Sequence, residues 1–162
     1  LESLKMRLAL FVLVCAGACL AADVLPDSFV GQFKQEKDEN FDEYLTAQGY
    51  GWFSRQAIKF ATFQKKFTKN GDKFDYENLT TKKDVKYTNV EFGKEFDGEG
   101  LDGTIHKVTF TKKGNSIFEK HVPPPGAEAK NEEYEYYIEG AYLVVKLRAP
   151  GGVEAKRFYK KL

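Results

Sequence analysis

The sequence predicts an all-β domain: an antiparallel β-barrel of about ten strands, with two short helices near its start. Three observations lead to this prediction. Apolar and polar residues alternate with a period of two over most of the chain beyond residue 62, which is the pattern of half-buried strands. Turn signals such as Asn70-Gly71 and Pro123-Pro124-Pro125 interrupt the alternation about every ten residues, as in a meander or barrel. Only residues 40–60 show a helical repeat.

Strand positions follow from these interruptions. Neighbouring residues that should lie on opposite faces are often both polar, as in Lys65-Lys66. This favours a barrel with a mixed, partly wet interior over a sandwich, which needs one uniformly aliphatic face. The ten strands are expected near residues 30–37, 63–69, 73–79, 85–92, 94–97, 104–112, 116–122, 132–138, 141–148 and 152–160.

Two helices are expected between the first and second strands. Asp38 is the better candidate for the first N-cap, ahead of Glu39. Gly49 and Gly51 would end this helix and allow a tight reversal. The two helices together are predicted to form a helix-turn-helix lid over a hollow. Their apolar faces are Phe41, Tyr44 and Leu45 on the first helix, and Trp52, Phe53, Ala57, Ile58 and Phe60 on the second.

The N-terminus has the pattern of a secretory signal peptide. Met6-Arg7 precedes an apolar run that is too short to span a bilayer, and small residues follow it. Cleavage fits after Ala21, and Ala18 is the alternative. We therefore divide the chain into a leader plus signal peptide (1–21) and a barrel domain (22–162), and expect a secreted, extracellular protein.

The composition of the remaining chain excludes several function classes. Removal of residues 1–21 leaves equal numbers of basic and acidic residues, so nothing favours nucleic acid as a partner. Both cysteines, Cys15 and Cys19, lie in the removed segment. With His106 and His121 as its two histidines, the chain assembles no His-based triad and no metal site. We expect no enzyme activity, no cofactor and no metal.

The sequon Asn78-Leu79-Thr80 is a candidate N-glycosylation site in a secreted chain. The alternative is an unmodified strand residue.

Four ordered motifs occur between about Phe29 and Leu162: Gly31-x-Phe33 with Asn40-Phe41-Asp42-x-Tyr44-Leu45, Gly49-x-Gly51 with Arg55-Gln56, Gly93-x-x-Phe96-Asp97, and Arg157-x-Tyr159. With these motifs, the chain resembles the intracellular lipid-binding protein family of the calycin superfamily, the fatty acid-binding β-clams. The signal peptide, Trp52 and the long polar turn from Thr80 to Tyr87 resemble the family's secreted nematode branch. The resemblance implies a ten-stranded, flattened up-and-down barrel (β-clam) that encloses one fatty acid or a similar lipid.

The resemblance places Arg157 and Tyr159 inside the barrel as the anchor of the ligand carboxylate. Residues two apart on a strand share one face, and an arginine donates two parallel hydrogen bonds to a carboxylate. The family usually adds a second cation or amide on the eighth strand. The matching position here falls near Glu135, where a tyrosine hydroxyl or an ordered water is the candidate substitute.

The predicted cavity and portal lining comes from the lid and from the turn facing it. Lys59, Lys65 and Lys66 are candidates to attract acidic membranes during transient contact; a solvated charged face is the alternative. The lining residues are Phe41, Tyr44, Leu45, Trp52, Phe53, Ile58 and Leu101.

The resulting functional hypothesis is a monomeric extracellular carrier. It would bind a long-chain fatty acid, or a related hydrophobic ligand such as a retinoid, and transport or sequester it. The alternative is a secreted structural or host-interaction protein without an obligatory lipid cargo.

Overall fold

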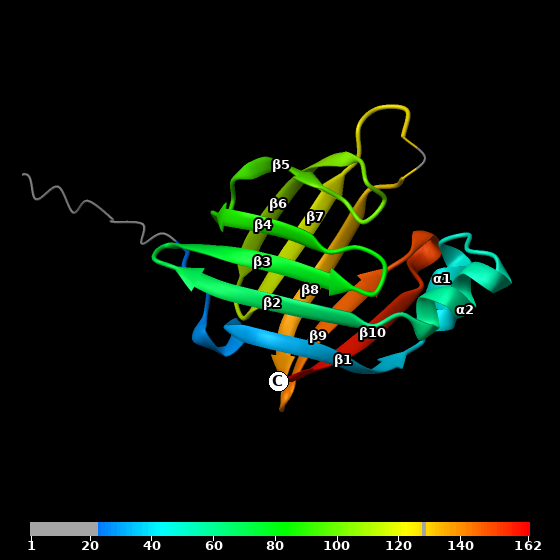
Figure 1. Ribbon diagram of the computed structural model, residues 1–162, viewed down its shortest axis with the longest axis horizontal. Helices are drawn as coiled ribbons and strands as arrows, with labels where there is room; N and C mark the ends of the chain where they lie inside the picture. Colours follow the sequence, from blue (N-terminus) through cyan, green and yellow to red (C-terminus); the bar gives the residue numbers. More distant parts are fainter. Residues whose placement is uncertain (1–22, 128) are drawn as a thin grey trace, which may run out of the picture.

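The computed structural model describes residues 23–127 and 129–162. The predicted signal peptide lies outside the described residues. In the described part, ten antiparallel strands form one sheet that curls into a barrel, with two helices at one end (Figure 1). The strands are β1 (Gly31–Glu39), β2 (Phe63–Asn70), β3 (Lys73–Thr80), β4 (Val85–Val90), β5 (Glu95–Glu99), β6 (Ile105–Lys113), β7 (Ser116–Val122), β8 (Glu132–Glu139), β9 (Tyr142–Arg148) and β10 (Glu154–Lys161).

The up-and-down topology confirms the predicted fold class. Strands that are neighbours in sequence pair with each other, with the exception of β4 and β5. In addition, the first strand, β1, pairs with the last, β10. The predicted strands agree with the observed ones to within a few residues, because turn residues define their ends. The barrel is therefore nearly closed, with a seam between β4 and β5.

Tyr87 of β4 fills this seam. Its hydroxyl donates to the carbonyl of Glu99 at 2.9 Å, and its ring lies 5.2 Å from that of Phe96 on β5. A Cβ atom on Gly98 would come within 2.7 Å of the Tyr87 ring. A glycine at position 98 thus allows the ring to lie across the gap.

The first helix begins two residues later than predicted. Strand β1 continues through Asp38 to Glu39, and α1 (Phe41–Ala47) follows Asn40, which has a left-handed backbone (φ 56°). Asp38 was expected as the N-cap; that prediction is wrong, because its carboxylate pairs with Arg157 across the sheet instead. The Asn40 side chain donates to the carbonyl of Glu154 at 2.7 Å, which ties the turn to β10.

The two helices differ in how they contact the barrel. In α1, Phe41, Tyr44 and Leu45 are buried, whereas α2 (Trp52–Phe60) has no buried residue. Helix α2 is held to α1 mainly through Asp42, which pairs with Arg55 at 3.4 Å and Lys59 at 3.1 Å. Arg55 is only 18% exposed, and Ile58 of α2 packs against the core. The Lys59–Asp42 pair is exposed, and such a pair contributes little to stability.

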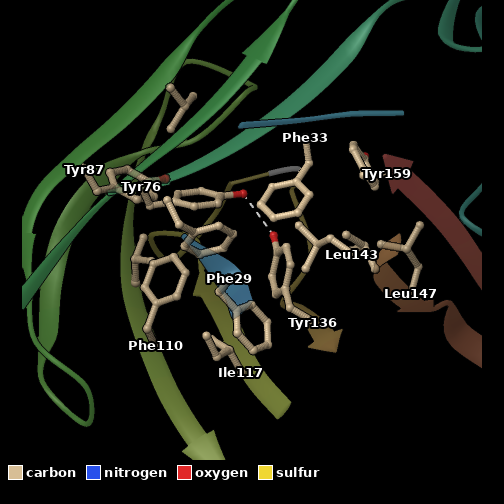
Figure 2. Packing of buried hydrophobic residues seen from close by; sticks show 14 of the residues in the cluster. Phe29, Phe33, Tyr76, Tyr87, Phe110, Ile117, Tyr136, Leu143, Leu147 and Tyr159 are labelled. Carbon is tan, nitrogen blue, oxygen red and sulfur yellow. Dashed lines mark hydrogen bonds between the residues drawn. The ribbon is translucent and has the colours of Figure 1, made fainter. Parts of the chain in front are cut away.

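The opposite end of the barrel is closed by the segment that precedes β1. A short 3-10 turn, η1 (Asp27–Phe29), brings Phe29 inward, where its ring contacts Phe67 edge to face at 6.2 Å. Figure 2 shows the aromatic cluster that this ring joins. The core fills the barrel between Phe29 and α1: Leu25, Phe33, Phe67, Phe74, Tyr76, Tyr87, Val108, Phe110, Ile117, Tyr136, Leu143, Val145 and Tyr159.

Candidate functional site

A chain of polar side chains crosses the apolar interior of the barrel. It begins at Lys65 on β2, continues through Tyr76 on β3 and Tyr136 on β8, and ends at Glu119 and His121 on β7. All five residues are at most 7% exposed. Figure 2 shows the two tyrosine hydroxyls pointing toward each other, joined by a hydrogen bond. We call these five residues the interior relay.

The hydrogen bonds of the relay run in one direction. The Lys65 ammonium, which can only donate, lies 2.9 Å from the Tyr76 oxygen. The Tyr76 and Tyr136 hydroxyls are 2.9 Å apart, and Tyr136 donates to Glu119 Oε2. His121 Nε2 lies 2.7 Å from Glu119 Oε1. Since an ionised carboxylate only accepts, the hydrogen bonds run from the Lys65 ammonium to Glu119, which also pairs with His121.

The electrostatics of the relay follow from burial and pairing. Burial alone would raise the pKa of the Glu119 carboxyl, but the hydrogen bond and charge of His121 hold that pKa below its usual value. Burial by itself would lower the pKa of His121, but the hydrogen bond and charge of Glu119 have the larger effect, so this pKa is raised. For Lys65, burial dominates and lowers the pKa to about 8. Glu119 and His121 thus stabilise each other's charged forms, whereas burial disfavours the charged form of Lys65.

A second polar group lies where β10 meets β1 and the helices. Arg157 is 6% exposed, and its Nε donates to Asp38 Oδ1 at 2.8 Å. Its guanidinium carbon lies 4.2 Å from the Phe41 ring centroid and 4.3 Å from that of Phe63. The guanidinium is thus held between two aromatic rings, which favour a cation electrostatically.

Tyr159, the other predicted anchor, lies two residues along β10 on the same face as Arg157. It is 1% exposed, and burial raises its pKa to about 12, so the hydroxyl keeps its proton at neutral pH. Figure 2 shows it next to Leu143 of β9. The structure thus brings Arg157 and Tyr159 to the inner wall; their role in binding a carboxylate stays a prediction.

The predicted lining residues separate into two groups. Phe41, Tyr44 and Leu45 are buried under α1, and Ile58 packs against the core from α2. Trp52, Phe53 and Leu101 are instead 58%, 83% and 44% exposed. The Trp52 and Phe53 rings contact each other edge to face at 4.9 Å. The first group lies at the barrel mouth, and the second lies on the surface.

On the eighth strand, the residue that faces the interior is Tyr136 and not Glu135. Tyr136 is fully buried opposite Val145, whereas Glu135 lies on the outer face and accepts from Ser116 Oγ at 2.8 Å. The prediction of a position near Glu135 is therefore corrected by one residue. A shift of one residue along a strand moves a side chain to the other face. A tyrosine thus faces the interior here, and its role in binding a headgroup stays a prediction.

Two further residues that the sequence singled out lie on the inner face of β2 and β3. Lys65 was placed on the surface near the lid, but it is buried in the barrel. Asn78, the candidate glycosylation site, is 9% exposed opposite Lys65 on β3, and its side-chain oxygen has no hydrogen-bond partner among the described residues. This burial favours the alternative of an unmodified strand residue, and glycosylation of Asn78 stays a prediction.

Sequence reasoning missed Lys65 and Glu119 as interior residues, although a signal existed. In Phe63-x-Lys65-x-Phe67 and Ile117-x-Glu119-x-His121, a charged residue takes an apolar position of the strand alternation. A charge at such a position lies on the inner face if the period of two holds. The alternation within β2 and within β7 therefore predicts that Lys65 and Glu119 face the interior.

Neither a metal site nor a membrane-spanning helix is found among residues 23–127 and 129–162. No group of three or more His, Cys, Asp or Glu residues there could hold a metal ion. No helix in this part is long and apolar enough to cross a membrane. A hollow of about 610 Å³ lies beside η1 and includes outward-facing Glu135, Lys146 and Lys156, so it is separate from the barrel interior.

The Glu119–His121 pair makes stability depend on pH. The Glu119 carboxylate stabilises the fold at pH values above the ordinary carboxyl pKa of 4.5. This stabilisation is lost as the pH falls through the lowered pKa of the folded state. The His121 imidazolium gives its full stabilisation at pH values below the ordinary imidazole pKa of 6.5. This stabilisation is lost as the pH rises through the raised pKa of the folded state.

We therefore expect the free energy of unfolding to fall by about 1 kcal/mol between pH 5.5 and 7.5, and this fall to be absent in His121→Gln. Urea denaturation at several pH values in this window measures it. Glu135→Gln serves as a control: Glu135 lies on the outer face of β8 and bonds to Ser116, so its change leaves the Glu119–His121 pair intact and should keep the fall. An equal fall in His121→Gln would contradict the assignment.

Comparison with known proteins identifies the architecture. "Fatty acid-binding protein homolog 1" of Caenorhabditis elegans is 56% identical over 153 residues, covering 93% of this chain and 95% of the relative. The chain belongs to the fatty acid-binding protein family. A scan against protein-family models finds no match.

Solved structures of fatty acid-binding proteins share the fold. As-p18, described as an extracellular fatty acid binding protein, superposes with a TM-score of 0.81 at 48% identity, covering 86% of this chain and all of that one. The Schistosoma mansoni fatty acid binding protein in complex with arachidonic acid superposes with a TM-score of 0.70 at 27% identity. The match covers 84% of this chain and 97% of the schistosome chain. The nearly closed ten-stranded barrel with two helices is the fold of this family.

Proposed function

We propose that this fatty acid-binding protein is an extracellular carrier that binds a long-chain fatty acid inside its barrel and transports or sequesters it. The observation that carries the proposal is Arg157, a buried cation on the inner wall beside Tyr159. Two relatives support it: As-p18 is described as extracellular, and the schistosome protein binds arachidonic acid. The predicted signal peptide is consistent with secretion.

The chemistry of a fatty acid requires an apolar wall for the tail and hydrogen-bond donors for the head. Phe67, Phe74 and Phe110 supply part of that wall. The head is a carboxylate, whose burial without a partner is very costly. Arg157 uses Nε for Asp38, and its terminal N–H groups have no hydrogen-bond partner among the described residues. These groups are the fork that binds a carboxylate with two parallel bonds.

The helices are the proposed entrance. Since α2 has no buried residue, whereas α1 buries Phe41, Tyr44 and Leu45, α2 is expected to move away from the mouth at a lower cost in free energy than α1. Trp52, Phe53 and Phe60 are exposed beside Lys59, a combination that suits transient contact with a lipid surface. The carrier would act as a monomer and would carry out no reaction.

The test compares an acid with its ester. Arg157→Ala is expected to weaken binding of oleate by roughly 10- to 100-fold while methyl oleate changes little, because hydrogen bonds to a charged group contribute about 1.5–3 kcal/mol. Displacement of a fluorescent fatty acid measures both affinities, and retinol in the same assay tests a retinoid cargo. Equal losses for acid and ester would contradict a carboxylate anchor.

Arg148→Ala is the matched control. Arg148 lies on β9 with its side chain 63% exposed and pairs with Glu154 on the outer wall, so its removal should leave both affinities unchanged. Lipid extraction of the secreted protein addresses the alternative function: a structural or host-interaction protein would contain no lipid and would bind neither probe.

A further inference from the structure

The interior relay leaves one buried cation without a carboxylate beside it. Lys65 is 6% exposed, and its ammonium lies 5.5 Å and 5.8 Å from the ring centroids of Tyr76 and Tyr136. An ammonium has three N–H donors. Among the described residues, one of them is used, in the bond to the Tyr76 hydroxyl.

Folding alone does not account for this cation. Its neighbours on the inner face of β2 are Phe63 and Phe67, and an apolar side chain at position 65 would pack with them. A buried charge destabilises a fold unless it is closely paired. Glu119 is separated from Lys65 by two tyrosine hydroxyls and is itself paired with His121 at 2.7 Å.

Lys65 adjoins the predicted carboxylate site. The Phe63 ring, which lies under the Arg157 guanidinium, is two residues before Lys65 on the same face of β2. One such step along a strand is about 7 Å. Asn78 lies opposite Lys65 with an unpartnered side-chain oxygen; a half-turn of this amide would present its NH₂ group to an anion.

We propose that Lys65 is a second anchor for the carboxylate of the bound fatty acid, supplied by β2 and acting together with Arg157 of β10. This rests on the function proposed above. The Tyr76 hydroxyl accepts one hydrogen bond from the Lys65 ammonium. The two other N–H groups of the ammonium are left to donate to the ligand. The bound class is then a long-chain monocarboxylate, whose single negative charge would pair with the Lys65 ammonium.

The groups around Lys65 also act on its charge. Burial and the charge of Arg157 lower the pKa of Lys65, Glu119 and Glu132 raise it, and the net value is about 8. His121, Tyr76, Tyr136, Tyr159 and Asp38 are the other titratable groups facing this part of the interior. A carboxylate bound at the ammonium would raise this pKa, so binding at pH above 8 would take up a proton.

The experiment compares Lys65→Met with Lys66→Met. Methionine keeps the apolar stem of lysine and removes the charge. Lys66 is adjacent, on the outer face, where it pairs with Glu77 at 2.9 Å. Lys65→Met should weaken oleate binding about tenfold and leave methyl oleate unchanged, whereas Lys66→Met should leave both unchanged. If Lys65→Met keeps the wild-type ratio of oleate to methyl oleate affinity, the inference is overturned.

A second measurement needs no variant. In the wild type, oleate affinity should fall as pH rises above about 8, by at most tenfold per pH unit, while methyl oleate affinity stays level. A level oleate profile from pH 7 to 9.5 would also overturn the inference. If the wild-type protein binds neither ligand, the proposed carrier function is overturned, and the role of Lys65 with it. If the protein binds oleate but shows neither the loss in Lys65→Met nor the fall above pH 8, only the inference about Lys65 is overturned.

Discussion

Glu119→Gln is expected to destabilise the protein by about 3–5 kcal/mol at pH 5.5, the range for breaking a buried ion pair. The substitution keeps the shape of the side chain but removes the only carboxylate of the interior relay. Lys65 then remains as a buried cation, His121 loses the hydrogen bond and the charge that raise its pKa, and Tyr136 donates to a neutral amide oxygen in place of a charged one. Urea denaturation followed by circular dichroism measures the change in the free energy of unfolding.

The pH dependence of this loss distinguishes charge from packing. At pH 7.5 and above, more of His121 can lose its proton, so the loss should become smaller than at pH 5.5. Glu135→Gln is the matched control, because Glu135 lies on the outer face of the neighbouring strand; its effect should stay within about 0.5 kcal/mol. A loss in Glu119→Gln that does not change with pH would show that packing alone is involved.

Phe110→Ala is expected to cost about 3–5 kcal/mol, the range for truncating a buried aromatic side chain. Phe110 is fully buried, and its ring lies 5.4 Å from Phe74, 5.2 Å from Tyr76 and 6.4 Å from Phe96. Removing the ring leaves a cavity that these strand-borne neighbours cannot fill without moving the sheet. Thermal unfolding should show a midpoint lowered by roughly 10 °C or more.

The control for this substitution is Phe118→Ala. Phe118 is half-buried on the outer face of β7, where Lys113 lies over its ring at 4.9 Å. Its truncation should cost about 1 kcal/mol, because little apolar area leaves a packed environment. Similar losses at both positions would show that the interior of the barrel is loosely packed.

The strands could be predicted from the sequence because their signals are local. Alternation identifies the strands, and turn residues such as Asn70-Gly71 mark their ends. The helical repeat in residues 40–60 identified both helices for the same reason. The exact start of α1 could not be predicted in this way, since Asp38 is held in β1 by a partner 119 residues away in the sequence.

The interior relay shows the opposite case. Its members come from β2, β3, β7 and β8, and the hydrogen bond between Tyr76 and Tyr136 joins residues 60 apart in the sequence. Alternation states which residues of one strand share a face, but the register between strands decides which of them meet. The register of β7 and β8 is what places Glu119 within reach of Tyr136.

By itself, the sequence determined an all-β chain of ten strands with two helices, and Arg157 and Tyr159 on one face of the last strand. Only the tertiary structure decided that Asp38 pairs with Arg157, that Tyr136 and not Glu135 faces inward, and that Lys65 is a buried cation. The physical reason is that strand propensity, turns and alternation act over a few neighbouring residues, whereas the pairing of buried charges depends on strand register and barrel closure.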